Sequence, residues 1–142
     1  VCVCVPCPPV NALTVAQWFE VADHVTAAGR NPDVRAVVLR AEGRGYNAGV
    51  DIKEMQNTTG FTALIGANKG CYAAFAAVYE CAVPVIAAVH GFCVGGGIGL
   101  AGNADIIVAS AFTPRSTRCQ VAPTSSLRHT SPQRSLAPGM AD

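Results

Sequence analysis

The chain has 142 residues, of which 51% are hydrophobic and 13% charged, and its formal net charge at pH 7 is +1. This composition suits one globular domain with a modest core, and it excludes the highly charged disordered and nucleic-acid-binding classes. The sequence contains neither an apolar run of roughly eighteen residues nor a secretory signal at its start. We therefore expect a cytoplasmic protein without nucleic-acid or membrane partners.

The charge and the residue types change at residue 111. Residues 1–110 contain six Lys/Arg and eight Asp/Glu, whereas residues 111–142 contain four Arg and one Asp. Arg, Ser, Thr and Pro dominate this last segment, which shows neither strand nor helix periodicity. Such a segment cannot bury enough apolar surface to offset the entropy of ordering it. We therefore predict a domain over residues 1–110 and a disordered tail over residues 111–142.

Residues 1–5 alternate valine with cysteine and predict a strand, which ends at Pro6 because proline lacks an amide hydrogen. Cys4 and Cys7 form one CxxC pair. A zinc site of this kind needs a second pair at a suitable spacing, so we predict no metal site.

Helical spacing begins after Thr14, the predicted N-cap, and extends to Gly29, the predicted C-terminal stop. Apolar residues at this spacing predict one buried face, made of Val15, Phe19, Ala22 and Val25. A β-branched run at residues 34–39 then predicts a second strand.

The middle of the chain predicts two further helices. The loop over residues 42–49 contains small residues, which leave its backbone accessible, and it runs into a helix near Asp51. Residues 61–81 are rich in alanine, with aromatic and aliphatic side chains between, which predicts one long helix before Pro84.

Three consecutive glycines, Gly95, Gly96 and Gly97, follow an apolar run at residues 85–89 that predicts a strand buried on both faces. Without Cβ atoms this turn can adopt positive φ, and its N–H groups can contact a ligand directly. Such a main-chain donor can stabilise a developing oxyanion. A glycine turn that only lets a short helix pack on the sheet remains the alternative.

Gly97, Gly99 and Gly102 also match the G-x-G-x-x-G pattern of dinucleotide sites. That site requires a full helix and then a strand with an acidic residue about twenty positions later. Here an apolar strand resumes at residues 105–108, which leaves room for only about two helical turns. We therefore do not expect dinucleotide binding.

Two segments taken together, Asn47–Met55 and the stretch from Pro84 through Gly97, resemble the signatures of the crotonase superfamily, also called the enoyl-CoA hydratase/isomerase family. Residues 9–13 are similar to the family segment before its first helix. Residues 105–109 resemble the strand after its second signature.

A finer likeness within the family is carried by residues 42–51 and 92–100. These stretches resemble actinobacterial members that act on steroid-derived CoA thioesters, in particular hydrolases that open a ring. The resemblance implies an α/β fold: the N-terminal part of a crotonase-type spiral of ββα turns, which binds an acyl-CoA.

Family membership also implies that the backbone N–H groups of Val50 and Gly96 hold the thioester oxygen as negative charge develops on it. The same resemblance implies that neighbouring residues bind coenzyme A, which enters as part of the substrate rather than as a separate cofactor. These residues are Ala48, Asp51, Ile52, Lys53 and Gly95.

Gly99 departs from the family pattern, because hydratases place a catalytic glutamate at that position. The region expected to supply a second glutamate falls in residues 111–142, with Cys119 near its place. The later family helices, which make trimer or hexamer contacts, have no counterpart in this tail, so we expect a truncated or frame-shifted product. Two hypotheses therefore stand: an acyl-CoA enzyme that hydrolyses a steroid-derived ring ester, and a non-catalytic fragment that keeps the CoA-binding core.

Four side chains in or near these segments, Asp51 among them, also have simpler structural interpretations. We expect helix capping or solvent exposure for Asp51 and Glu54, and a structural hydrogen bond for His90. Cys93 has no evident base in the sequence that would activate it as a nucleophile.

Overall fold

The computed structural model describes residues 1–4, 10–57 and 61–111. Cys7 of the CxxC pair lies outside these ranges, as do residues 112–142, which make up nearly all of the predicted tail.

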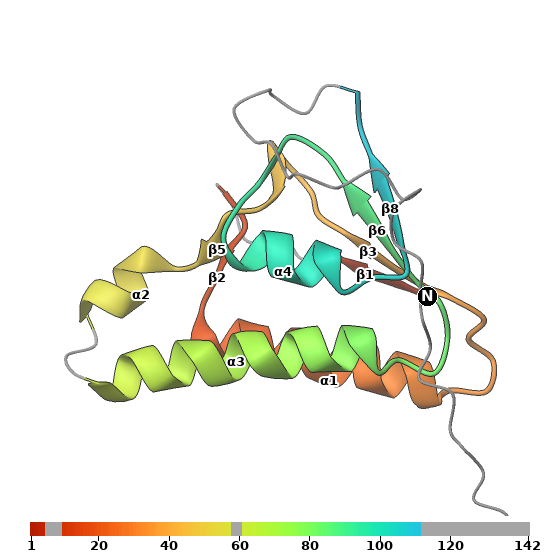
Figure 1. Cartoon of the computed structure of the whole chain (residues 1–142), viewed down its shortest axis with the longest axis horizontal. Coiled ribbons are helices and arrows are strands. Elements are labelled where there is room, and N and C mark those ends of the chain that lie inside the picture. The colour runs from red at the N-terminus through yellow and green to blue at the C-terminus, as the bar shows by residue number, and fades with distance from the viewer. Residues whose placement is uncertain (5–9, 58–60, 112–142) are drawn as a thin grey trace, which may run out of the picture.

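A parallel sheet of four strands forms one layer of the structure (Figure 1). Its order is β1 (Cys2–Cys4), β3 (Val37–Arg40), β6 (Val85–Val89) and β8 (Ile106–Ala109). Each strand of this sheet thus lies beside the strand of the same sheet that comes before it along the chain. The register places one row of apolar residues across the sheet: Val3, Leu39, Ala87 and Ile107.

Short strands form two further parallel pairs, β2 (Ala12–Leu13) with β5 (Gly49–Val50), and β4 (Gly45–Asn47) with β7 (Phe92–Cys93). The first three strands of the large sheet are each followed by short strands and then a helix, so the chain forms successive ββα turns. This arrangement confirms the predicted α/β spiral. The strands of these two pairs have only two or three residues each and lie in glycine-containing or turn segments without a clear hydrophobic period, so the sequence pattern did not predict them.

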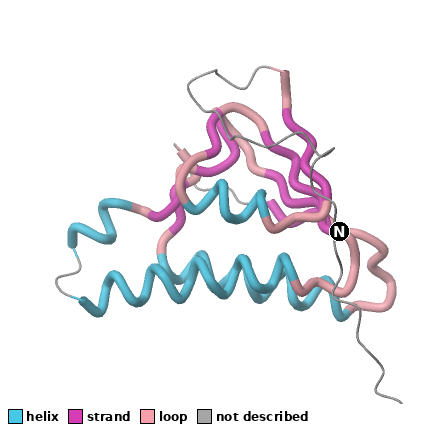
Figure 2. The backbone as a smooth tube through the Cα atoms, in the orientation of Figure 1, coloured by secondary structure: helices cyan, strands magenta, loops and turns pink. Residues whose placement is uncertain are grey.

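The helices of the described residues are α1 (Val15–Arg30), α2 (Ile52–Asn57), α3 (Phe61–Tyr79) and α4 (Gly96–Gly102). Helices α1 and α3 pack along each other, and α4 lies between this pair and the strands (Figure 1). Figure 2 shows the same separation of a helical layer from the strands. The long helix predicted from residue 61 and the short helix predicted after the glycines are both confirmed.

The N-terminus of α1 is fixed by a capping box. The Thr14 hydroxyl accepts from the Gln17 amide at 3.3 Å, and Gln17 Oε1 accepts from the Thr14 amide at 2.9 Å. The predicted stop at Gly29 is wrong, because α1 continues to Arg30 and its C-cap is Asn31. Gly29 serves close packing instead, since a Cβ there would lie 2.9 Å from Cys81 Sγ.

The buried face of α1 differs from the predicted one at Phe19, which is 41% exposed. Trp18, beside it, is fully buried and meets the Phe75 ring of α3 edge to face, with 5.8 Å between ring centroids. Space for the indole exists because Gly96, which faces the ring, has no side chain. Gly70 allows α3 to approach the Trp18 Cβ, which would lie 3.0 Å from a Cβ at residue 70. The residues that α1 buries are Trp18, Val21, Ala22, Val25 and Ala28.

Strand β6 is buried on one face rather than on both. Val85, Ala87 and Val89 lie in the core, whereas Ile86 and Ala88 are only half-buried. The helices of the described residues cover one side of the sheet, which accounts for the alternation.

None of these helices combines the length and the apolar character that a membrane crossing requires.

We predict that Trp18→Ala lowers the free energy of unfolding by about 3–5 kcal/mol, because it empties the space between α1, α3 and α4. Chemical denaturation measures the loss. Phe19→Ala, one position along the same helix, is the matched control and should cost far less because its ring is 41% exposed. Equal losses for the two variants would contradict this account of the core.

Candidate functional site

Two glycine-containing segments meet at the carboxyl ends of the paired strands β4 and β7. Parallel pairing brings these ends together, and Val94 N donates to Asn47 O at 3.0 Å across them. A Cβ on Gly49 would lie 3.0 Å from Gly96 N, and a Cβ on Gly95 would lie 3.7 Å from Gly49 Cα. The tertiary structure therefore places the two segments singled out in the sequence in direct backbone contact.

Glycine is required at two of these positions by backbone conformation as well as by space. Gly49 has φ +89° and Gly95 has φ +55°, a region that residues with a Cβ rarely adopt. Any side chain on Gly49 would also press against the Gly96 amide.

The orientation of the two predicted donors follows from their hydrogen-bonded neighbours. Asp51 N donates to Leu13 O at 2.9 Å, and since successive N–H groups of a strand point to opposite sides, the Val50 N–H points away from β2. Gly96 is the first residue of α4, so its N–H has no acceptor within that helix.

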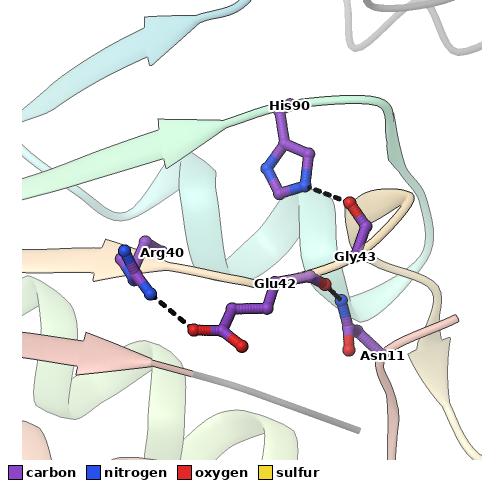
Figure 3. Close-up of polar contacts among 5 residues, drawn as sticks. All are labelled: Asn11, Arg40, Glu42, Gly43 and His90. Atoms are coloured by element: carbon purple, nitrogen blue, oxygen red, sulfur yellow. Dashed lines mark hydrogen bonds and ion pairs between the residues drawn. The ribbon is translucent and has the colours of Figure 1, made fainter. Parts of the chain in front are cut away.

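Two buried asparagines, Asn11 and Asn47, connect the segments around this contact, and sequence analysis missed both. Asn11 Nδ2 donates to Glu42 O at 2.7 Å and to Gly45 O at 2.8 Å, and Figure 3 shows the first of these bonds. Asn47 Nδ2 donates to Asn11 O at 2.7 Å, and Asn47 Oδ1 accepts from Gly49 N at 2.7 Å. The only sequence signal was an amide side chain beside small residues in each segment.

Asp51 and Glu54 both cap helices. Asp51 Oδ1 accepts from Lys53 N at 2.8 Å in the first turn of α2, as the capping interpretation predicts. Glu54 Oε2 accepts from Val15 N at 2.8 Å and so caps α1, not its own helix. Both carboxylates therefore have structural partners.

The other residues predicted to bind coenzyme A flank the backbone contact along the chain. Ala48 is half-buried, Lys53 and Gly95 are exposed, and Ile52 has 69% of its surface accessible. Lys53 is therefore a positive charge at the surface, three residues after Val50.

His90 forms a hydrogen bond with the backbone, and Cys93 lies in the core. His90 Nε2 donates to Gly43 O at 3.0 Å in the tautomer protonated there, which is the structural hydrogen bond we expected (Figure 3). Nearby, Arg40 and Glu42 form an exposed ion pair at 2.6 Å. Cys93 is fully buried, which separates its thiol from any substrate.

Gly99 faces the Phe75 ring of α3. A Cβ at this position would overlap the ring, with 2.7 Å to Cε2. The aromatic ring thus occupies the space that any side chain at residue 99 would need. This side of α4 is apolar as a result.

An open groove of about 430 Å³ begins at Phe75 and continues between α3 and the C-terminal end of α4. Half of its lining residues are aromatic, and the full set is Tyr72, Phe75, Ala76, Tyr79, Glu80 and Asn103.

Two buried polar atoms near the glycines, Trp18 Nε1 and Tyr46 Oη, have no hydrogen-bond partner among the described residues. Burial raises the pKa of Tyr46 above its ordinary value, with a smaller contribution from Cys93, so the phenol stays neutral. Over the described ranges, no group of three or more His, Cys, Asp or Glu side chains could hold a metal ion.

We predict that Gly99→Ala lowers the free energy of unfolding by about 1–3 kcal/mol, because the new methyl group displaces the Phe75 ring. In a Phe75→Ala background the same change should cost much less, and denaturation of the four proteins in this cycle measures the coupling. Gly102→Ala is the control on the same helix: nothing lies within 4 Å of its Cβ position, so it should be neutral or stabilising. Additive losses would show that Phe75 does not limit residue 99.

The chain is similar to known proteins over most of its described residues. Residues 4–119 match the sequence model of the enoyl-CoA hydratase/isomerase family. A protein of Mycobacterium tuberculosis named (7aS)-7a-methyl-1,5-dioxo-2,3,5,6,7,7a-hexahydro-1H-indene-carboxyl-CoA hydrolase is 76% identical over 110 residues, which are 78% of this chain and 44% of the relative. The protein of the same name from Rhodococcus jostii is 73% identical over 103 residues, 72% of this chain and 40% of the relative.

Solved structures match the fold as well. An enoyl-CoA hydratase/carnithine racemase from Magnetospirillum magneticum has a TM-score of 0.70 at 30% identity and covers 76% of this chain and 42% of its own. An enoyl-CoA hydratase from Mycobacterium smegmatis has a TM-score of 0.69 at 30% identity, with 76% and 43% covered. The chain spans less than half the length of these relatives. Its ββα turns, its paired glycine segments and its matched sequence together show that the chain belongs to the enoyl-CoA hydratase/isomerase family.

Proposed function

We propose that this chain binds an acyl-CoA thioester and stabilises negative charge on the thioester oxygen with the backbone N–H groups of Val50 and Gly96. The observation that carries the proposal is the contact between Gly49 and the Gly96 amide, 3.0 Å from the Cβ position of Gly49. Gly49 directly precedes Val50, the first donor, and this contact places it against Gly96, the second donor. Two donors on neighbouring loops can converge on a single oxygen.

The chemical need for such a pair follows from the reactions of thioesters. Loss of an α-proton gives an enolate, and attack by water gives a tetrahedral adduct, and both leave negative charge on the carbonyl oxygen. Fixed main-chain donors stabilise that charge without reorganising, and each contributes about 3–4 kcal/mol to the transition state. A carboxylate at residue 99 is not required for this part of the mechanism.

Coenzyme A would lie along the segment that contains Ala48, Asp51, Ile52 and Lys53, with Gly95 opposite. Lys53 is exposed and can reach a phosphate, and exposed Ile52 offers apolar surface to the adenine. Asp51 acts there through the first turn of α2, which its side chain caps. Coenzyme A is thus part of the substrate rather than a separate cofactor.

The acyl group we propose is a ring-containing one of steroid origin, which the chain would hydrolyse. Support comes from the two relatives above 70% identity, which are named as hydrolases of a hexahydro-indene-carboxyl-CoA. The aromatic groove that begins at Phe75 could hold apolar rings, since it lies next to Gly99, one helical turn beyond Gly96.

The compartment and the assembly belong to the same proposal. We place the protein in the cytoplasm, in keeping with the absence of a disulfide among its described cysteines. The whole protein would form trimers or hexamers, as its family does.

A second candidate function is CoA-ester binding without turnover. It is favoured by the state of the nearby titratable side chains, because Asp51 and Glu54 cap helices and His90 binds a backbone carbonyl. These three side chains are held in structural hydrogen bonds, so none of them is placed to activate water.

Turnover and binding assays on the same preparation separate these functions. If the first is correct, water cleaves a carbon–carbon bond of the ring and the thioester stays intact, so the indene-carboxyl-CoA ester gives a single product one water heavier, detected by mass spectrometry. Hydrolysis of the thioester itself would instead release free coenzyme A. Gly49→Ala should then lower kcat about 100-fold or more, because its Cβ displaces a donor. Gly43→Ala is the matched control: its φ of +86° imposes the same backbone strain, but nothing lies within 4 Å of its Cβ position.

Other outcomes of this experiment decide between the two candidates. Stabilisation by coenzyme A without turnover would support the binding function; at 100 times Kd it amounts to about 2.7 kcal/mol. If the chain shows no turnover and coenzyme A does not stabilise it, both functions are excluded. Equal kcat losses in Gly43→Ala and Gly49→Ala would remove the support for paired donors.

We predict that Lys53→Ala weakens coenzyme A binding about 5- to 20-fold, because a phosphate loses its charged donor. Isothermal titration at two salt concentrations measures the loss, which should shrink at high salt. Lys69→Ala removes another exposed lysine, from α3, and should leave the affinity unchanged. If the two variants bind alike, the phosphate partner lies elsewhere.

A further inference from the structure

Asn47 begins the segment that contains Val50, and it is hydrogen-bonded both to that segment and to the segment that contains Gly96. It is buried, with 1% of its surface exposed. Its Oδ1 accepts from Gly49 N at 2.7 Å, directly before Val50, and its backbone oxygen accepts from Val94 N at 3.0 Å, two residues before Gly96. One residue therefore connects the approaches to both donors.

The first turn of α4 also rests on Asn47. A Cβ on Gly97 would lie 2.7 Å from Asn47 O and 2.9 Å from Asn47 Oδ1, so only glycine allows the helix to come this close. The asparagine thus determines how near α4, which begins with Gly96, can approach β5, which ends with Val50.

Asn11 fixes Asn47 in turn. Asn11 O accepts from Asn47 Nδ2 at 2.7 Å, and Asn11 is itself 3% exposed, with φ +54°. Its side chain donates to the carbonyls of Glu42 and Gly45, which lie just before Asn47 in the chain. The side-chain hydrogen bonds of this network are buried or partly buried. Water therefore cannot easily replace a partner that is removed.

We propose that Asn47 is a positioning residue that sets the separation and the direction of the Val50 and Gly96 N–H groups. The inference rests on the proposed function, since it assumes that these donors share one oxygen. Oxyanion stabilisation requires donors within about 2.7–3.1 Å of the charged oxygen, so a small movement of either loop weakens it. Alanine at residue 47 leaves the Gly49 N–H without its acceptor and releases that loop.

A ligand pair separates positioning from simple stabilisation of the fold. Acetoacetyl-CoA forms an enolate with a near-ultraviolet absorption band, and paired donors on its oxygen increase the enolate fraction at a given pH. Coenzyme A has the same nucleotide part but no such oxygen. We expect Asn47→Ala to lower the enolate affinity about 10-fold or more, and to change the Kd of coenzyme A less than about twofold.

Asn31→Ala is the matched control for this variant. Asn31 Oδ1 accepts from the N–H two residues ahead, at 2.9 Å, in the same local pattern as Asn47, but at the far end of α1. The Asn31→Ala variant should leave the enolate band unchanged. Asn47→Ser, whose hydroxyl can accept weakly from the same N–H, should fall between wild type and alanine.

The outcomes separate failure of the inference from failure of the proposed function. An unchanged chain that produces no enolate band disproves the proposed function, and the inference with it. A band that Asn47→Ala leaves intact, or equal losses for both ligands, overturns the inference alone. Should Asn47→Ala lack a cooperative melt, Asn47→Ser takes its place, and rapid hydrogen exchange of the Gly49 or Val94 amide in the unchanged chain would also overturn it.

Discussion

Gly49 and Gly96 pack backbone against backbone, and the arrangement of the site depends on this approach. The Gly96 nitrogen lies 3.0 Å from the place where a Cβ of Gly49 would be, and Gly49 holds a φ of +89°. Any other residue would meet both a steric and a conformational penalty there. Side chains are therefore absent at the point where the two main-chain segments lie closest together.

Side chains provide the support around this contact instead. Trp18 fills the space against Gly96, Phe75 fills the space against Gly99, and the two rings meet edge to face. Asn11 and Asn47 satisfy the backbone groups of the loops that cross there. The nearby carboxylates of Asp51 and Glu54 cap helices α2 and α1.

The spiral topology explains how residues so far apart in sequence come together. Each ββα turn adds a strand beside the last one, so β4 and β7 lie in neighbouring turns and end at the same edge. Loops that follow equivalent strands are then neighbours in space. Family membership accounts for the shared topology. The chain spans less than half of its relatives' length, and the activity of the whole protein is therefore a proposal.

Periodicity and glycine content in the sequence determined the long elements and the two loops of interest. The capping box at Thr14, the helix from Phe61 and the strand from Val85 were all predictable, because each depends on residues near in sequence. Pairing of the two glycine segments came from family resemblance, since no local pattern specifies which loops meet.

Tertiary packing alone decided the rest. It made Trp18 rather than Phe19 the buried aromatic residue of α1, because Gly96 on α4 leaves space for the indole and Gly70 on α3 allows close approach to the Trp18 Cβ. It assigned Glu54 to the N-terminus of α1 and made Asn11 and Asn47 the connection between loops. These partners lie 36 and 39 positions apart, and separations of that size leave no periodic trace in a sequence, so only the folded chain reveals them.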